Sequence, residues 1–253
     1  MKINKYIYII TLVLMFSFIN YEEVYSVEIV KGKKIVYITF DDGPSPGTTN
    51  EILNILKKND TTATFFVVGS KIRENTEVIK KINDSGMSIM PHTDKNIYNS
   101  LSYNSKSYFD DLKECEKTIY NLTGKNNFAF IRIPGSSCNT IAKEEVLDEI
   151  KNNIINDGKY YIDWSVDCSD SNEVKSRVNF IESRLREYGG LYKVEVVRMN
   201  DFQNKLTTIG ILQKTIDFYK ERGYEFKNLD NIEQWEIDYL KSIDVINRVN
   251  SEE

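Results

Sequence analysis

Short runs of β-branched and aromatic residues recur along the chain and predict strands, because such side chains suit a buried, pleated backbone. The clearest run, Val36 to Phe40, stops abruptly at Asp41, Asp42, Gly43 and Pro44, a sequence typical of a turn. The predicted strands cover residues 35–40, 63–68, 128–133, 160–166, 192–197 and 224–229.

Amphipathic segments separate these runs and predict helices, since their apolar residues return at helical spacing. Several end at a glycine, which commonly terminates a helix. The predicted helices cover residues 49–58, 77–85, 106–122, 143–153, 174–188 and 208–222. Strand and helix alternate throughout, which favours a parallel sheet or barrel in a single α/β domain. We expect its core at residues 35–229, followed by a helical tail at 232–253.

The N-terminus has the pattern of a secretory signal. Lys2 and Lys5 precede an apolar run at residues 6–19, and a polar stretch ends at Ser26. We therefore predict a signal peptide at residues 1–26 and a mature protein at 27–253. The apolar run of about 14 residues is short for a membrane span, which needs about 20. An uncleaved membrane anchor remains the alternative.

No later stretch is apolar enough to cross a membrane, so we expect a secreted or cell-wall-associated protein with no membrane span after signal cleavage. The formal net charge is −5, which gives no reason to expect a nucleic-acid partner. The chain has three cysteines, and their spacing matches no zinc motif. An odd number leaves at least one free thiol.

The adjacent carboxylates of Asp41 and Asp42 suggest a functional site at a strand end. Two neighbouring acids repel each other unless a metal ion or an arginine lies between them. The alternative is structural, because aspartate also caps ordinary turns.

The stretch from Thr39 to Pro44 reads TFDDGP and resembles the first signature of the polysaccharide deacetylases, the NodB-homology or carbohydrate esterase family 4 proteins. The resemblance extends from about residue 35 to 229. It implies a distorted (β/α) TIM-like barrel with zinc or another divalent metal at the C-terminal ends of the strands. In this resemblance Asp41 matches the general base and Asp42 a metal-binding carboxylate.

The second family motif, His-Ser/Thr-x-x-His, is incomplete in this chain. His92 matches the first metal ligand, but Asn96 occupies the position of the second, and the sequence contains one histidine in total. An amide oxygen is a much poorer zinc ligand than an imidazole. Asp94 as a substitute oxygen donor remains an open alternative.

The third and fourth motifs match better. Arg132, Pro134 and Gly135 resemble the Arg-x-Pro-Gly motif, in which the arginine holds the catalytic base in place and the loop borders the substrate groove. Asp163 and Trp164 resemble the Asp-Trp motif, in which the aspartate orients the catalytic acid and the tryptophan walls the groove. Trp164 as an ordinary core residue is the alternative, since large aromatic residues are mostly core material.

The final motif, Leu-x-His-Asp in relatives, reads Arg198-Met199-Asn200-Asp201 here. Asn200 replaces the acid histidine and cannot donate a proton at neutral pH, a loss that typically costs 10²–10⁴-fold in rate. Arg198 replaces the leucine of the acetyl pocket. Our hypothesis is that Arg198 and Arg132 compensate the charge of the retained carboxylates in place of a metal. The alternative is that Arg198 points away from the site.

The family resemblance also places the loops of Cys138 and Cys168 at the same end of the barrel, where a disulfide between them is one option. A metal site built instead from Asp94, Asp201 or Asn200 is another.

Two functions from different classes therefore follow from the sequence. The first is a secreted N-deacetylase of cell-wall glycan, with peptidoglycan the expected substrate and an activity weakened by the two missing histidines. The second is a pseudoenzyme that binds glycan or a wall protein without turnover, with or without a bound metal. The histidine count separates the two, since an ordinary member needs three.

Overall fold

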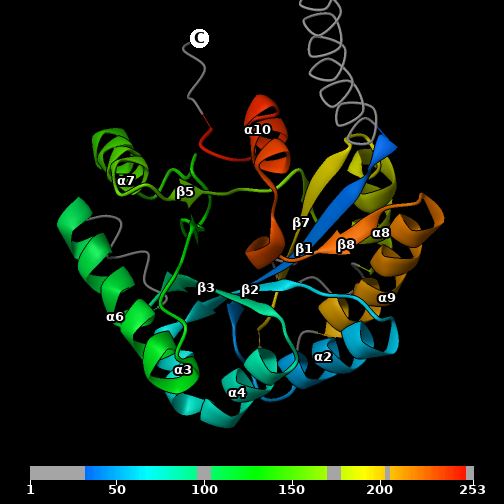
Figure 1. Ribbon diagram of the computed structural model, residues 1–253, viewed down its shortest axis with the longest axis horizontal. Coiled ribbons are helices and arrows are strands. Elements are labelled where there is room, and N and C mark those ends of the chain that lie inside the picture. The colour runs from blue at the N-terminus through cyan, green and yellow to red at the C-terminus, as the bar shows by residue number, and fades with distance from the viewer. Residues whose placement is uncertain (1–31, 96–103, 170–177, 203–205, 249–253) are drawn as a thin grey trace, which may run out of the picture. The chain divides into compact units, whose positions relative to one another are not determined.

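The fold is given by a computed structural model that describes residues 32–95, 104–169, 178–202 and 206–248 (Figure 1). Residues 35–253 form one compact unit. The predicted signal peptide lies outside the described residues and stays a prediction. Within the described part of the chain, none of the helices has both the length and the apolar composition needed to cross a bilayer.

The central strand is β1 (Ile35–Gly43), in which every residue is buried. One edge of β1 pairs along its length with β7 (Val194–Asn200). The other edge pairs first with β8 (Glu225–Lys227) and then with β2 (Thr64–Val68). All of these pairings are parallel, so the carboxyl ends of the strands meet at one edge of the sheet.

Two further strands extend this sheet, and two form a second one. β3 (Ser88–Thr93) pairs with β2, and β6 (Val166–Asp167) pairs with β7. β4 (Phe130–Ile131) and β5 (Tyr160–Tyr161) make a separate parallel pair. The expected parallel α/β fold is confirmed.

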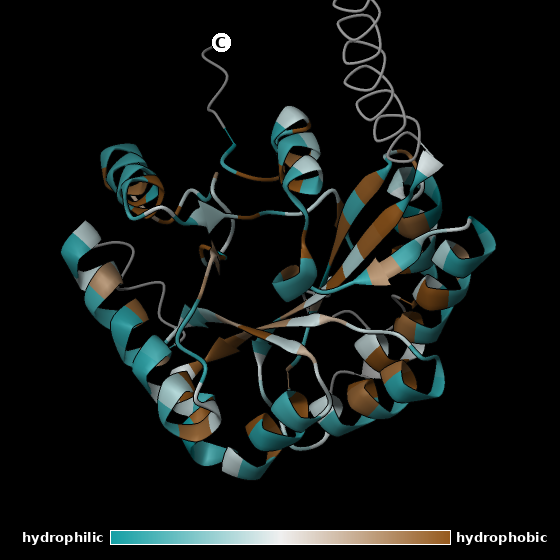
Figure 2. Cartoon of the chain, in the orientation of Figure 1, coloured by the Kyte–Doolittle hydropathy of each residue, from teal (hydrophilic) through white to brown (hydrophobic). Residues whose placement is uncertain are grey.

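Helices surround the sheets, as Figure 1 shows, and their apolar residues face inward (Figure 2). In α4, for example, Val78, Ile79 and Ile82 are buried while the intervening polar residues face outward. The described helices are α2 (Thr48–Lys58), α3 (Gly69–Glu74), α4 (Thr76–Asp84), α6 (Ser105–Thr123), α7 (Glu144–Asn156), α8 (Val178–Tyr188), α9 (Leu206–Glu221), α10 (Gln234–Ser242) and the 3₁₀ helix η1 (Leu229–Asn231).

Local sequence signals set the ends of α6. The side chain of Asn104 accepts a hydrogen bond from the Ser107 amide, which satisfies a donor left free by the first helical turn. Gly124 ends the helix in the left-handed conformation, with φ 76°.

The C-terminal segment pairs with the residues that follow β5. Ile162 forms an antiparallel bridge with Ile246, and the Asp163 amide donates to the Val245 carbonyl at 2.8 Å. Val245 and Ile246 are both buried. Within the predicted tail at 232–253, residues 234–242 form α10, and Val245 and Ile246 pack into the fold; residues 249–253 lie outside the described part of the chain.

The structure differs from the predicted elements in several places, one of which is the unpredicted short helix α3. β3 was not predicted, because a strand buried on both faces shows no alternation and because Pro91 argues against a strand. The strand predicted at residues 160–166 is two short strands, β5 and β6, with residues 162–165 between them. Residues 174–177 of the predicted helix at 174–188 lie outside the described part of the chain.

Candidate active site

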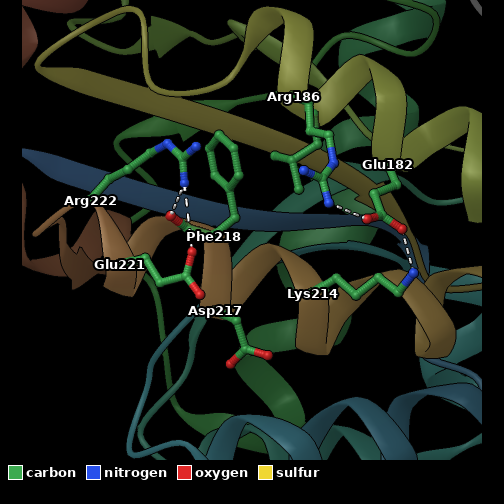
Figure 3. Close-up of a pocket in the computed structure, with 8 residues that line it drawn as sticks. Glu182, Arg186, Lys214, Asp217, Phe218, Glu221 and Arg222 are labelled. Carbon is green, nitrogen blue, oxygen red and sulfur yellow. Dashed lines mark hydrogen bonds and ion pairs between the residues drawn. The ribbon is translucent and has the colours of Figure 1, made fainter.

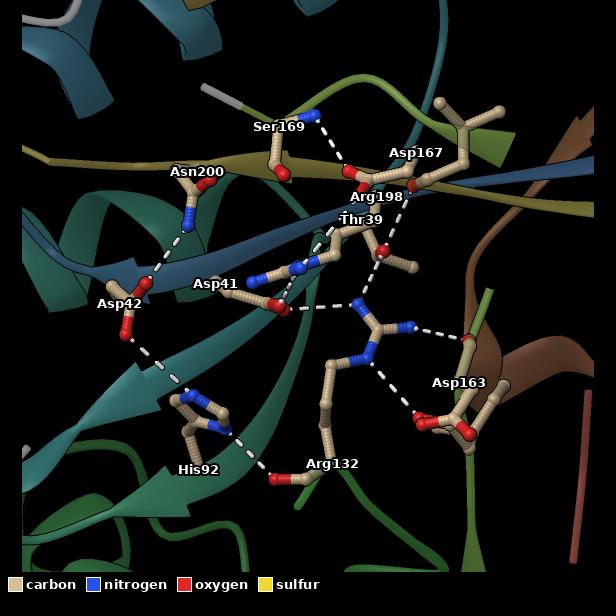
Figure 4. Close-up of polar contacts among 12 residues, drawn as sticks. Thr39, Asp41, Asp42, His92, Arg132, Asp163, Asp167, Ser169, Arg198 and Asn200 are labelled. Atoms are coloured by element: carbon tan, nitrogen blue, oxygen red, sulfur yellow. Dashed lines mark hydrogen bonds and ion pairs between the residues drawn. The ribbon is translucent and has the colours of Figure 1, made fainter. Parts of the chain in front are cut away.

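The carboxyl ends of several parallel strands bring the predicted site residues together (Figure 4). β1 supplies Asp41 and Asp42, β3 supplies His92, and β7 supplies Arg198 and Asn200. Arg132 and Asp163 follow β4 and β5. Parallel strands place their carboxyl ends on the same side, which explains why residues far apart in sequence converge here.

The pairing register of β1 and β7 determines where Arg198 and Asn200 lie, the two residues of the final motif that depart from the family pattern. Asn200 lies opposite Asp41, and Arg198 lies opposite Thr39 on one side and Asp167 of β6 on the other. Because side chains alternate along a strand, positions 198 and 200 point to the same face. Both therefore project toward the carboxylates of β1.

Asp41 is held by two guanidinium groups. Its Oδ1 accepts a hydrogen bond from Arg132 Nη1 at 2.9 Å, and its Oδ2 accepts one from Arg198 Nε at 2.9 Å. Its carboxylate is almost completely buried. The expected pairing of Arg132 with Asp41 is present, and Arg198 shares the site. The alternative that Arg198 points away is wrong.

Arg132 is fixed by several partners. It donates to Thr39 Oγ1 at 2.6 Å and to the backbone carbonyls of Ile162 and Asp163, and its guanidinium lies 4.2 Å from the Phe66 ring centroid. Burial lowers the pKa of Arg132, against the opposing effect of the Asp41 carboxylate. An arginine stays charged even so, which makes Arg132 a rigid counter-charge for Asp41.

Arg198 packs on the predicted groove residue Trp164. Its guanidinium carbon lies 4.1 Å from the Trp164 ring centroid, and its Nη1 lies 4.0 Å from Asp167 Oδ2. Burial lowers the pKa of Arg198, but the charges of Asp41 and Asp167 outweigh this effect and raise it above the usual value. Trp164 is half-buried and packs against the core, so it belongs to both the site and the core boundary.

Asp42 and His92 face each other beside this pair. Asp42 has a left-handed backbone, with φ 70°, and its Oδ1 lies 3.5 Å from His92 Nε2. The His92 Nδ1 is 2.8 Å from the Arg132 carbonyl, which can only accept, so Nδ1 carries the hydrogen. Burial raises the pKa of Asp42, but the hydrogen bond and charge of His92 outweigh burial, so the pKa of Asp42 is lowered overall. Burial lowers the pKa of His92, but Asp42 outweighs burial there, so the pKa of His92 is raised overall.

The donor set matches a metal only in part. Two donors bound tetrahedrally to zinc lie about 3.4 Å apart, so the 3.5 Å between Asp42 Oδ1 and His92 Nε2 suits an ion. The anchored Nδ1 is also typical of a ligating histidine. Catalytic zinc, however, uses three protein ligands, and no cluster of three His, Cys, Asp or Glu side chains exists among the described residues. Asn96 lies outside them. The residues described therefore do not fit a catalytic zinc.

Asp94 does not complete this set, so the proposed substitution by Asp94 is wrong. Its carboxylate accepts two hydrogen bonds from Arg73, at 2.6 and 2.9 Å, which link the residue after β3 to α3. It also packs so closely on Gly69 that a Cβ there would lie 2.1 Å from Asp94 Oδ1. Glycine is required at position 69 because Asp94 occupies that space.

Asp201 and Asn200 are also engaged. Asp201 accepts hydrogen bonds from Ser45 Oγ at 3.1 Å and Thr49 Oγ1 at 2.5 Å, and burial raises its pKa to about 7. Asn200 Nδ2 donates to Asp42 Oδ2 at 2.8 Å, whereas Asn200 Oδ1 is buried and has no hydrogen-bond partner among the described residues. Asn200 therefore binds the carboxylate that the family uses for metal.

Asp163 binds the loop that carries Pro134 and Gly135. Its two carboxylate oxygens accept hydrogen bonds from the backbone amide and the hydroxyl of Ser137. Gly135 and Ser136 both have positive φ, at 78° and 101°, so the loop turns sharply here. The interaction holds the loop beside the site.

Sequence reasoning missed several contributors to the site: Thr39, Lys71, Ser137 and Asp167. Lys71 donates to the backbone oxygen of Asp42, and Thr39 donates to the Val197 carbonyl. Each is an ordinary polar residue in a strand, loop or helix. Only the spatial arrangement identifies them.

The three cysteines are free thiols. Cys138 is exposed, whereas Cys115 and Cys168 are buried. A disulfide between Cys138 and Cys168 is therefore absent, and that option is wrong for this structure.

A surface cavity lies away from these residues, between α8 and α9 (Figure 3). Its charged side chains pair with one another: Glu182 with Lys214 and, at 2.7 Å, with Arg186. Arg222 covers the Phe218 ring at 3.6 Å. The cavity holds none of the predicted site residues.

Comparison with known proteins agrees with the fold. The sequence profile described as polysaccharide deacetylase matches residues 29–151. A peptidoglycan-N-acetylglucosamine deacetylase of Bacillus cereus is 28% identical over 200 residues, which cover 78% of this chain and 70% of that protein.

Solved structures show the same barrel. The catalytic domain of a peptidoglycan N-acetylglucosamine deacetylase from Eubacterium rectale has a TM-score of 0.71 at 28% identity, covering 78% of this chain and 89% of that one. A carbohydrate esterase family 4 pseudoenzyme from Bacillus anthracis has a TM-score of 0.63 at 24% identity, covering 79% and 65%, and shares the fold. The predicted distorted (β/α) barrel is confirmed.

Proposed function

We propose that this chain is a member of the polysaccharide deacetylase family and that it binds cell-wall glycan without the deacetylation that its relatives' names describe. The observation that carries the proposal is the engagement of both Asp41 oxygens by Arg132 and Arg198. Homologues named peptidoglycan deacetylases support peptidoglycan as the glycan.

The site chemistry opposes turnover at two points. A general base must offer a lone pair to the proton it removes, and Asp41 would have to release a guanidinium to do so. The departing amine then needs a proton, and Asn200, in the position of the acid histidine, cannot supply one. Each of these two defects slows the reaction.

The same residues still favour glycan binding. Trp164 offers an aromatic surface of the kind that packs against apolar ligand faces, and the Pro134–Gly135 loop is held beside it by Asp163. These residues form the proposed groove wall. We further propose that the predicted signal peptide exports the protein to the cell wall.

A second candidate is slow metal-dependent deacetylation of the same glycan. Members of the family are generally metal-dependent, and the 3.5 Å between Asp42 Oδ1 and His92 Nε2 favours this candidate.

The test combines binding and turnover on the purified protein. Co-sedimentation with N-acetylated peptidoglycan measures binding, and acetate release with added zinc, cobalt or manganese measures turnover, each beside an Asp41→Asn variant. We expect binding, and acetate release no greater than that of the variant. Release that disappears in Asp41→Asn would establish the enzyme instead. Absence of sedimentation would refute glycan binding.

A further inference from the structure

Five charged side chains form a row of ion pairs across the site. Arg132 and Arg198 each contact Asp41 at 2.9 Å. Arg198 lies 4.0 Å from Asp167, which in turn lies 3.7 Å from Arg184. The row contains three guanidinium groups and two carboxylates, so it carries one excess positive charge.

The neighbouring acids do not cancel this charge by contact with the row. The Asp163 carboxylate accepts its hydrogen bonds from Ser137. Asp42 lies against His92, accepts a hydrogen bond from Asn200, and has the Lys71 ammonium on its backbone oxygen. Their charges still act on the arginines, Asp42 on Arg198 and Asp163 on Arg132, so what distinguishes Arg198 is the geometry of its guanidinium.

Arg198 is the member of the row that a ligand in the groove would meet. Its Nε is used on Asp41, but its Nη atoms donate no hydrogen bond within the part of the chain that the structure describes, and Nη1 is 4.0 Å from Asp167. The Arg198 side chain keeps 16% of its exposure, so it is not sealed inside the core.

Trp164 fixes how this guanidinium is presented. The ring lies 4.1 Å from the guanidinium carbon and covers one face, while the bond from Nε to Asp41 sets the in-plane direction. An arginine held in this way presents two parallel N–H donors, which match the two oxygens of a carboxylate.

We infer that Arg198 makes this site a receptor for the carboxylate of an acidic amino sugar in cell-wall glycan. The inference rests on the proposed glycan binding and adds the ligand class to it. A neutral N-acetyl sugar offers a single carbonyl oxygen in place of the paired oxygens. A deacetylated sugar presents an ammonium, which has no lone pair to accept a hydrogen bond from the guanidinium.

The test compares three soluble disaccharides on the purified protein by calorimetry at low salt. The first contains N-acetylglucosamine and N-acetylmuramic acid and therefore carries a lactyl carboxylate. The second contains two N-acetylglucosamine units, and the third two glucosamine units. We expect the acidic disaccharide to bind about tenfold more tightly than the neutral one, and the amine to bind most weakly.

Variants locate the effect. Arg198→Leu should abolish the preference for the acidic sugar, and Arg198→Lys should retain part of it because the charge remains. Arg222→Leu is the matched control, since Arg222 also lies over an aromatic ring but outside the site; the preference should be unchanged.

The outcomes separate the two proposals. Equal affinity for the acidic and neutral sugars, or a preference for the amine, would overturn the carboxylate inference and leave glycan binding intact. No binding of any sugar would overturn both. The comparison on the unaltered protein decides the matter even if an Arg198 variant does not fold.

Discussion

Arg198 Nε lies 2.9 Å from Asp41 Oδ2, on the side of the carboxylate opposite Arg132. In the family motif a leucine stands at position 198. Under the roles that the family resemblance implies, the exchange places a fixed positive charge against the general base and removes an apolar side chain from the acetyl pocket. Asn200, two residues later on the same strand, stands at the position of the acid histidine.

Arg198→Leu should destabilise the protein by about 1–3 kcal/mol, because Asp41 remains buried with one of its two counter-charges removed. Urea unfolding monitored by circular dichroism measures the change. Arg186→Leu, which breaks a surface pair on α8, should cost at most about 1 kcal/mol. An Arg198→Leu midpoint equal to that of the unaltered protein would show that the ion pair is not structural.

Restoring the family residues should create activity. Asn96→His, Arg198→Leu and Asn200→His together supply the second metal ligand, the apolar acetyl pocket and the acid histidine. We expect zinc-dependent acetate release from N-acetylated glycan well above that of the unaltered protein. The matched control adds Asp41→Asn to the triple variant and should remove the release.

If the folded triple variant binds zinc but releases no acetate, then positions 96, 198 and 200 are not the ones that abolish turnover. The same variant without Arg198→Leu isolates the contribution of the arginine. We expect it to be slower, because Asp41 is still engaged.

Asp201 should make stability depend on pH. Its folded pKa is raised to about 7 by burial, from an ordinary value of 3.8. The folded protein therefore holds this proton more tightly, and the stabilisation is complete below pH 3.8 and is lost as pH rises through about 7. The effect amounts to at most about 4 kcal/mol.

Asp201→Asn removes this proton equilibrium, so the variant should gain stability relative to the unaltered protein between pH 4.5 and pH 8. Thermal or urea unfolding at both pH values gives the difference. A difference in unfolding free energy that is the same at both pH values would rule out titration of Asp201 in this range.

The C-terminal segment should be needed for the site. Ile246 is fully buried and bridges Ile162, next to Asp163 and Trp164. Ile246→Ala should cost about 2–4 kcal/mol through the cavity it leaves, and it should weaken glycan binding by loosening Trp164. Ile155→Ala, at an exposed position on α7, is the control and should change little. Unaltered binding by a destabilised Ile246→Ala variant would separate this segment from the groove.

Local patterns explain how much of the fold was predictable. The amphipathic helices carry their period in the sequence, and α2, α4, α6, α7 and α9 lie within a few residues of their predicted ranges. β3 was not predicted, because burial on both faces removes the alternation of apolar and polar residues and because proline is unfavourable inside a strand. His92 was nevertheless identified as a site residue, because its motif is recognisable without the strand that carries it.

The sequence by itself determined the family resemblance, the parallel α/β barrel and the absence of two expected histidines, because these follow from residue types at fixed spacing. Only the tertiary structure decided where Arg198 and Asp94 point. Arg198 faces Asp41 because β7 pairs with β1 in a particular register, and Asp94 turns to Arg73 because Gly69 leaves it room. Side-chain direction at a strand end depends on neighbours that are remote in sequence, so spacing alone cannot determine it.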